Sequence, residues 1–310
     1  MKVVSLFSGA GGLDMGFIWA GHKVVWANDN FPDAVETYKT NIGNHVRLGP
    51  IEDIPSEEIP GCDVVVGGFP CQGFSVANWT RKTEDPRNRL YLEMCRVVRD
   101  KQPRFFVAEN VRGLVSIEKG RILEMIKKDF SDLGYNVSHV VLNSANYGVP
   151  QKRIRVFLLG TRKDLRSRIK FPPAQTHHDP SKRALVIQSK PWVSVGEALK
   201  NIPEEPGKGN YPNHTCSNYK LRFNGYLGHR RIDPSQPSPT VTARGDDKGG
   251  VVILHHPSNK RRMTVRELAT VQSFPLNYVF EGCQTSAYRQ IGNAVPPLLA
   301  KAVAGVLPKK

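Results

Sequence analysis

The chain has 310 residues, of which 39% are hydrophobic and 23% are charged. This length suits one large or two modest domains with a sizeable core, and the composition excludes an intrinsically disordered chain. We expect no membrane span, because no run approaches the roughly 18 consecutive apolar residues that one needs. The N-terminal "MKVVSLFSGAGG" reaches glycine too early for the apolar core of a signal peptide.

The charge is strongly basic. Lys and Arg number 44 against 28 Asp and Glu, which gives a net charge of +16. Such an excess favours a polyanionic partner such as nucleic acid, although a merely basic surface is the alternative.

The five cysteines are odd in number, and none is spaced as C-x-x-C. We therefore expect neither a disulfide framework nor a metal site. A reducing cytoplasm is the expected compartment, and there a free thiolate can act as a catalyst.

Short apolar runs alternate with helical patterns through the first half of the chain. Strands are predicted at 2–7, 23–28, 62–68, 104–110, 136–143 and 155–161, and helices at 13–21, 32–41, 88–100 and 121–134. This alternation predicts an α/β fold with a doubly wound, mostly parallel sheet.

After about residue 171 the composition changes. Residues 173–286 are basic and rich in Pro, Gly and polar residues, which predicts a second, smaller and loop-rich domain. Helical patterning returns at 264–274 and 294–307.

Polar or glycine-rich stretches follow four of the predicted strands, where ligands bind in parallel sheets. In "FSGAGGLDMG" (7–16), glycines between a strand and a helix could let a ligand approach the backbone. Asp14 stands where the dinucleotide fingerprint needs its last glycine, and no Walker Gly-Lys-Ser/Thr follows. A tight turn without a ligand is the alternative. Asp29 follows about 20 residues later, where a carboxylate can accept ribose hydroxyls, so the pair suggests a nucleoside cofactor without a pyrophosphate.

Cys71 lies in "GGFPCQGFS" (67–75), whose glycines and proline predict a loop. A helix start after it would lower the pKa of the thiol, whereas free cysteines are more often small core residues. The zinc deaminases of nucleobases need a second cysteine where Phe74 stands, and an H-x-E upstream that the chain lacks, so that site is excluded.

Glu109 in "AENV" closes an apolar strand, as either a helix cap or a site acid. Apolar neighbours would raise its pKa, which suits a proton donor. Arg153 and Arg155 in "QKRIR" occupy alternate positions, so both would face one side of an extended segment. A solvated charge pair is the other interpretation.

Six motifs together resemble the DNA (cytosine-5)-methyltransferase family, and the chain's size is similar to that of bacterial restriction-modification type II methyltransferases. The motifs are "FSGAGG", "GFPCQGFS", "ENV", "QKRIR", "TVRELATVQSFP" and "IGNAVPP", and they occur in the family's order. The resemblance implies an S-adenosylmethionine-dependent methyltransferase fold at 1–172 and a target-recognition domain at 173–286. It also implies that 287–310 packs back on the catalytic domain.

The resemblance assigns catalytic roles to four residues. Cys71 matches the nucleophile that adds to carbon 6 of a flipped-out cytosine, and Glu109 matches the group that stabilises ring nitrogen 3. Arg153 and Arg155 match the family's paired arginines, with Arg155 expected to hold the carbonyl oxygen of the base.

The resemblance also implies S-adenosyl-L-methionine as the cofactor, S-adenosyl-L-homocysteine as the product, and no metal. The family's adenine-contacting Asp is replaced by Pro50, and whether Asp53 substitutes for it is left open. The matching cofactor positions are Phe7, Ala10, Gly12, Asp29, Asn30, Ile51, Pro70, Leu90, Asn293, Ala294 and Val295.

Double-stranded DNA is the implied partner. In the family, a loop that occupies the place of 75–88 closes on the DNA, and specificity lies in the loop-rich domain. Thr240 matches the family's threonine at the start of the base-reading loops, and the arginines could meet guanine edges or phosphates. The DNA-binding candidates are Ser75, Arg81, Lys82, Arg87, Arg230, Arg231, Thr240 and Arg244.

The resulting hypothesis is a sequence-specific, monomeric DNA methyltransferase of the prokaryotic cytoplasm, associated with the nucleoid. A restriction endonuclease would be its functional, not physical, partner. One alternative is an RNA (tRNA) cytosine-5 methyltransferase, whose Cys-Phe-Thr signature the chain lacks. Another is a DNA-binding relative without catalysis, which intact Cys71, Glu109, Arg153 and Arg155 disfavour.

Overall fold

A computed structural model describes residues 1–69, 86–166, 169–181, 188–215, 229–243, 253–258 and 260–309; of 86–89, 229 and 253 only the backbone is described. Several candidate residues lie outside the described residues: Pro70, Cys71, Ser75, Arg81, Lys82, Arg244 and the side chain of Arg87.

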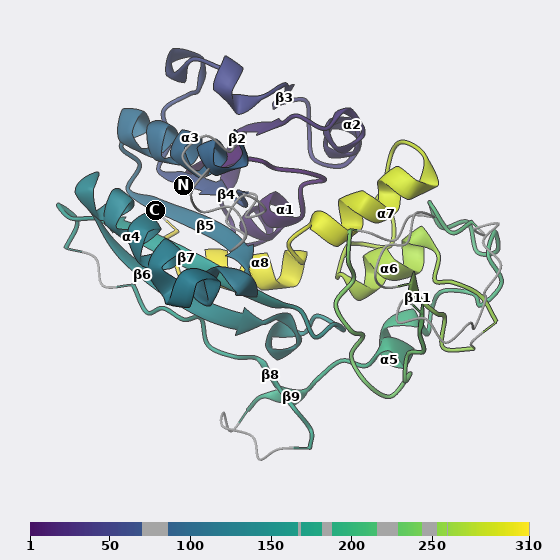
Figure 1. Ribbon diagram of the computed structural model, residues 1–310. Helices are drawn as coiled ribbons and strands as arrows, with labels where there is room; N and C mark the ends of the chain where they lie inside the picture. The colour runs from purple at the N-terminus through teal and green to yellow at the C-terminus, as the bar shows by residue number, and fades with distance from the viewer. Residues whose placement is uncertain are drawn as a thin grey trace.

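A seven-stranded sheet forms the larger lobe (Figure 1). Its order is β3 (Val46–Leu48), β2 (Lys23–Asp29), β1 (Lys2–Leu6), β4 (Val64–Gly67), β5 (Phe105–Val111), β7 (Ile154–Arg162) and β6 (Tyr135–Asn143). The first five strands are parallel, and β7 runs antiparallel to both neighbours. The predicted mostly parallel, doubly wound sheet is thus confirmed. The strand order reverses between β1 and β4, the point where such sheets bind ligands.

Apolar residues alternate between the two faces of the sheet, as the pleat requires. Along β5, Phe106 and Ala108 join one buried cluster, and Phe105 and Val107 join another. The first cluster is covered by α3 (Pro86–Lys101) and α4 (Arg121–Asp132), and the second by α1 (Gly12–Trp19) and α8 (Pro297–Ala304). Helix α2 (Pro32–Asn41) packs beside β2 and β3. Short 3-10 turns cover Ile51–Asp53, Ser56–Glu58, Arg112–Val115, Ile117–Gly120 and Ser144–Tyr147.

The end of the chain returns to the larger lobe. Helix α8 packs so closely on α1 that a Cβ added at Gly16 would lie 2.3 Å from the Cβ of Ala300. Helix α7 (Gln284–Asn293) spans the expected boundary at 286/287, so that division of the chain remains a prediction.

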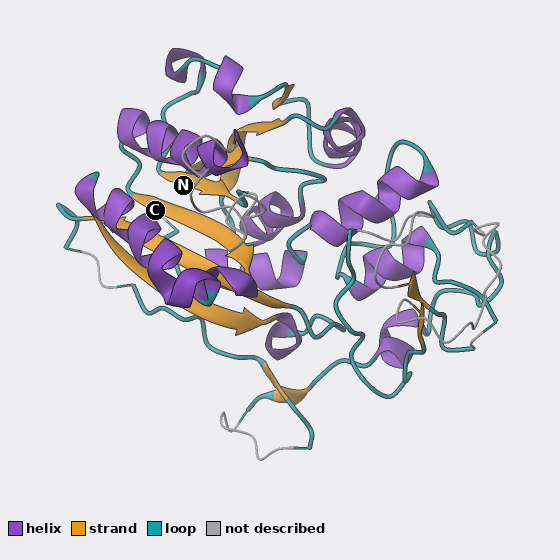
Figure 2. Cartoon of the chain, in the orientation of Figure 1, coloured by secondary structure: helices purple, strands orange, loops and turns teal. Residues whose placement is uncertain are grey.

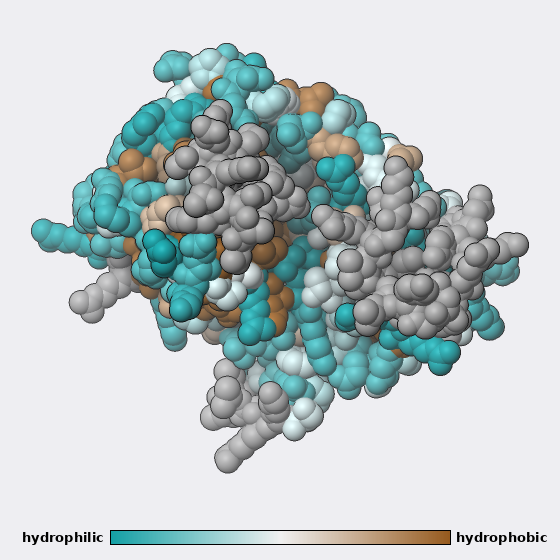
Figure 3. Space-filling model, viewed as in Figure 1, coloured by the Kyte–Doolittle hydropathy of each residue, from teal (hydrophilic) through white to brown (hydrophobic). Residues whose placement is uncertain are grey.

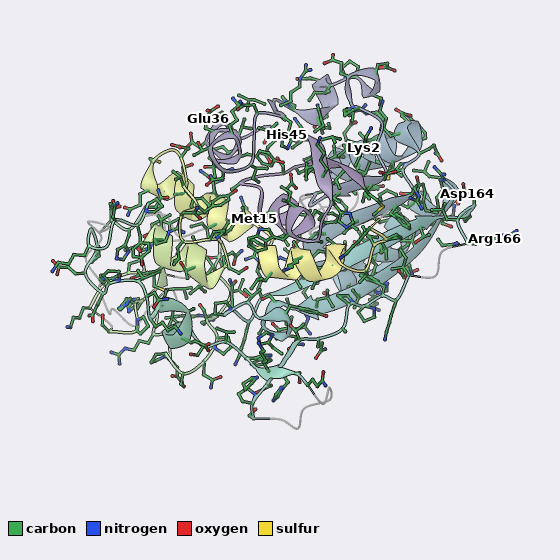
Figure 4. All side chains as sticks on the ribbon, turned by 180° about the vertical axis from the view of Figure 1, so that it is seen from behind. Lys2, Met15, Glu36, His45, Asp164 and Arg166 are labelled. Atoms are coloured by element: carbon green, nitrogen blue, oxygen red, sulfur yellow. The ribbon has the colours of Figure 1, made fainter. Side chains whose placement is uncertain are left out.

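The smaller lobe contains mostly loops (Figure 2). Its helices are α5 (Val195–Leu199), α6 (Val265–Val271) and α7, and its two-residue strands are β10 (His229–Arg230) and β11 (Ile253–Leu254). The strands β8 (His177–His178) and β9 (Lys190–Pro191) pair in the connection between the lobes. A third apolar cluster fills the lobe and includes Met15 of α1, which lies near the middle of the molecule in Figure 4. The two lobes therefore share a core.

Within the described residues, no helix is both long and apolar enough to cross a membrane. The face in Figure 3 is mostly hydrophilic, with hydrophobic residues gathered near its middle.

Candidate active site

The turn after β1 is backbone-strained and open. Phe7 has a φ of 54°, and Gly9 and Gly11 have φ values of 53° and 79°. A left-handed non-glycine residue costs about 1–3 kcal/mol and is typical of functional sites. A Cβ added at Gly9 would meet no atom within 4 Å, so there is free space beside this backbone.

The same turn contacts the segment after α7. A Cβ added at Gly12 would lie 2.3 Å from the Val295 carbonyl oxygen and 3.3 Å from the Ala294 Cβ. The structure therefore brings together the candidates at the two ends of the chain. Ala10 and Val295 are buried, and Asn293 is exposed.

Asp29 ends β2 beside this turn. Its Oδ2 accepts a hydrogen bond from the Gly9 amide at 2.7 Å, and its Oδ1 accepts one from the Phe31 amide at 2.9 Å. Burial raises the pKa of Asp29, although the amides of Phe31, Gly9 and Asn30 partly offset the shift. A carboxylate offers about four acceptor sites, so Asp29 keeps capacity for hydroxyl donors. Asn30, next to it, is exposed.

The expected adenine side of the site is apolar. Ile51 is 2% exposed within the buried cluster against which Phe7 and Leu90 pack. Asp53 is exposed, and no contact with another described residue gives its side chain a role at the site; its substitution for the missing acid stays open.

Glu109 and Arg155 form a buried ion pair, with 2.9 Å between Glu109 Oε1 and Arg155 Nε. Burial raises the pKa of Glu109, and the charges of Arg155 and Arg153 oppose the shift. The 3-10 turn that follows has no side-chain cap, so Glu109 is not a helix cap. The alternative interpretation of Arg153 and Arg155 as a solvated charge pair is also wrong, because both side chains are largely buried.

The pair lies against the chain that leads to Cys71. A Cβ added at Gly68 would be 2.9 Å from Glu109 Oε2. The neighbouring Asn110 donates from Nδ2 to the Phe69 carbonyl at 3.0 Å. Strand β5 thus supplies the acid and also fixes the last described residue before Pro70 and Cys71.

Arg153 has different partners from Arg155. Its Nη1 donates to the Val241 carbonyl and its Nη2 to the Gly292 carbonyl, both at 2.8 Å. Burial is also the main reason that its pKa is lowered. The two arginines face one region only in part: Arg155 pairs with Glu109, while Arg153 joins the two lobes.

Three DNA-binding candidates with described side chains, Arg230, Arg231 and Thr240, lie in the smaller lobe. Thr240 Oγ1 donates to the Lys152 carbonyl at 2.9 Å, and Arg230 and Arg231 are exposed. Sequence reasoning missed Asn110, Gln151 and Gln272 as site residues. Asn110 lies in "ENV", Gln151 in "QKRIR" and Gln272 in "TVRELATVQSFP". Their places in these family motifs were the only sequence signal that pointed to them.

Together these groups can hold a nucleoside at one edge of the sheet and present a carboxylic acid beside it. No group of three or more His, Cys, Asp or Glu side chains in the described ranges could hold a metal ion.

Comparison with known proteins agrees with this geometry. The model of the family described as C-5 cytosine-specific DNA methylase matches residues 1–309. The Neisseria gonorrhoeae type II methyltransferase M.NgoFVII is 39% identical over 96% of this chain and 83% of its own. The Methanothermobacter thermautotrophicus type II methyltransferase M.MthTI is 35% identical over 100% of this chain and 97% of its own.

The solved structure of the S. pombe Dnmt2 methyltransferase shares the fold, with a TM-score of 0.71 at 20% identity over 98% of this chain and 96% of its own. The family model, which matches nearly the whole length, and the relatives at 39% and 35% identity show that this chain belongs to the C-5 cytosine-specific DNA methylase family and is a DNA (cytosine-5)-methyltransferase.

Proposed function

We propose that the protein methylates carbon 5 of a specific cytosine that is flipped out of duplex DNA, through a covalent adduct with Cys71. The observation that carries this proposal is the Glu109–Arg155 pair, whose Glu109 lies against Gly68, two residues before Pro70 and three before Cys71. A buried acid of raised pKa next to a nucleophile segment is what activation of a cytosine ring requires.

The site fits S-adenosylmethionine, the donor that the family implies. Free space at Gly9, the acceptor oxygens of Asp29 and the apolar wall near Phe7 and Ile51 suit a nucleoside. When bound there, S-adenosylmethionine supplies the methyl group. We assign it the described residues Phe7, Ala10, Gly12, Asp29, Asn30, Ile51, Leu90, Asn293, Ala294 and Val295, together with Pro70.

In the proposed mechanism the Cys71 thiolate forms a bond to carbon 6 of the cytosine. The electrons of the 5,6 double bond then make carbon 5 nucleophilic. Glu109, whose pKa is raised by burial, donates to ring nitrogen 3 and limits the negative charge on the ring. Arg155 holds the Glu109 carboxyl in position and faces the carbonyl oxygen of the base.

After methylation, a base removes the proton from carbon 5. The electrons of that bond restore the double bond, and the Cys71 thiolate leaves. The flip that precedes these steps costs a few kcal/mol of stacking and pairing, offset by contacts in the pocket.

Arg81, Lys82 and Arg87, with Ser75, are proposed to meet the DNA backbone, in line with the net charge of +16. Arg230, Arg231, Thr240 and Arg244 are proposed to contact bases or phosphates of the target.

The names of the type II relatives support a role in a restriction-modification system. There the enzyme would act as a monomer in the cytoplasm, near the nucleoid, and protect host DNA from a partner endonuclease.

The acid role is tested with Glu109→Gln. Because the amide cannot supply a proton, we expect methyl transfer to fall about 100-fold or more, while the Kd for S-adenosylhomocysteine changes less than threefold. Incorporation of a tritiated methyl group into DNA and equilibrium dialysis measure the two quantities. Equal losses in both would remove Glu109 from the chemistry.

A further inference from the structure

A chain of side-chain amides crosses the junction of the two lobes. The Val241 amide donates to Gln151 Oε1 at 2.9 Å, and Gln151 Nε2 donates to Gln272 Oε1. Gln272 Nε2 then donates to the carbonyls of Ile291 and Ala294, at 3.1 and 2.7 Å. Both glutamines are completely buried, so the chain runs through the interior.

The backbone fixes the direction of this chain. The Val241 N–H can meet only an oxygen of Gln151, and the Ile291 and Ala294 carbonyls can meet only the amino group of Gln272. The remaining amino group of Gln151 therefore faces the remaining oxygen of Gln272. Neither amide can turn over without leaving buried donors and acceptors unpaired, which destabilises the folded state.

Arg153 forms a second connection parallel to the first, through its bonds to the Val241 and Gly292 carbonyls. Val241 is thus held by both its amide and its carbonyl. The approach is close, because a Cβ added at Gly292 would lie 2.3 Å from the Thr242 carbonyl carbon and the Ala243 nitrogen. Close-packed groups of this kind move together rather than separately.

The two ends of this hydrogen-bonded series, Val241 and Ala294, lie at places with different proposed functions. Val241 follows Thr240, at the start of the proposed DNA-reading segment. Ala294 is the residue whose Cβ approaches Gly12 on the cofactor edge. Between them, Gln151 lies two residues before Arg153 and four before Arg155, the partner of Glu109.

We infer that Gln151 and Gln272 are positioning residues. They couple the proposed DNA-reading segment that starts at Thr240 to the proposed cofactor site near Gly12 and Ala294. Binding of target DNA and binding of cofactor then favour each other, and the coupling passes through the two amides. This inference rests on the proposed function and adds to it the residues through which the two substrates of the reaction communicate. Thermodynamic linkage requires the effect to be the same in both directions.

The test measures the Kd of S-adenosylhomocysteine with and without a duplex that carries the methylation site, mapped beforehand by bisulfite sequencing of host DNA. In the wild type, the duplex should tighten cofactor binding about fivefold or more. Gln272→Met and Gln151→Met should bring this ratio close to one. The double variant should lose no more than either single one, because both residues belong to one chain.

Gln290→Met is the matched control. Gln290 is also a buried glutamine and lies on α7. Its Nε2 donates to the Glu281 carbonyl and to Ser286 Oγ, so it takes no part in the hydrogen bonds that link Val241 to Ala294. This variant should keep the wild-type ratio of the two Kd values. It therefore separates the effect of removing any buried amide from the effect of breaking the hydrogen bonds through Gln151 and Gln272. If either Met variant does not fold, Gln→Asn at the same position replaces it, because it keeps the amide and shortens its reach.

An unchanged ratio in the glutamine variants, or a ratio of one in a wild type that methylates DNA, would overturn the inference and leave the proposed function standing. A wild type that binds cofactor but methylates no cytosine would overturn the proposed function itself, and the inference with it.

Discussion

The two lobes stabilise their interiors by different means. The larger lobe pairs its backbone in a sheet and buries valines and phenylalanines on both faces. The smaller lobe has few regular elements, so its buried carbonyls need side-chain donors. Arg266 is one such donor: it is fully buried and donates to the carbonyls of Pro212, Pro275 and Tyr278.

One buried ionisable group from each lobe allows a comparison. Burial lowers the pKa of Arg266 only to about 10, so it stays charged at neutral pH. In the larger lobe, Asp14 accepts hydrogen bonds from Ser5 Oγ at 2.6 Å and from the Tyr38 hydroxyl at 2.7 Å. Burial raises its pKa to about 6. Arg266 thus keeps its charge as a structural donor in the smaller lobe, whereas Asp14 in the larger lobe titrates close to neutral pH.

Arg266→Met should give the largest effect, because it removes the hydrogen bonds that the guanidinium donates to the carbonyls of Pro212, Pro275 and Tyr278. We expect the free energy of unfolding to fall by about 3 kcal/mol or more, as measured by urea denaturation. Lys128→Ala, at an exposed position of α4, should leave the midpoint unchanged. An Arg266→Met variant as stable as the wild type would show that the loops of the smaller lobe do not depend on this side chain.

Asp14→Asn should give a smaller effect, which depends on pH. Because the folded pKa is raised to about 6 from 3.8, the folded state holds the proton more tightly than the unfolded state. Protonated Asp14 therefore contributes fully to the free energy of unfolding below about pH 4. That contribution is lost as the pH rises through about 6, and the total loss is about 3 kcal/mol.

Removing that ionisation should flatten the fall in stability between pH 4 and pH 6. Urea denaturation of wild type and Asp14→Asn across this range measures the difference. Parallel profiles for the two proteins would mean that Asp14 does not titrate in this window.

The sheet and its motifs were predictable, because runs such as Val64–Val66 are typical of buried strands and the motifs follow the strands directly. Helix α7 was not predicted: its N-cap residue, Cys283, provides no side-chain cap, and many of its residues are polar. The short strand β3 and helix α5 lack enough residues to show a period.

Within the site, the pairing of Glu109 with Arg155 follows from the register of β5 and β7. The separate role of Arg153 does not, since its partners Val241 and Gly292 lie 88 and 139 residues further along the chain. Contacts across such distances depend on how the lobes pack, which no local pattern encodes.

The most direct test of covalent cytosine methylation is trapping with 5-fluorocytosine at the mapped target. Fluorine blocks removal of the carbon 5 substituent, so the adduct should accumulate. We predict a covalent protein–DNA complex that forms only with S-adenosylmethionine and that Cys71→Ser abolishes, observed by denaturing gel electrophoresis and mass spectrometry. A wild-type protein that methylates the site but forms no adduct, or an adduct that survives Cys71→Ser, would contradict the account.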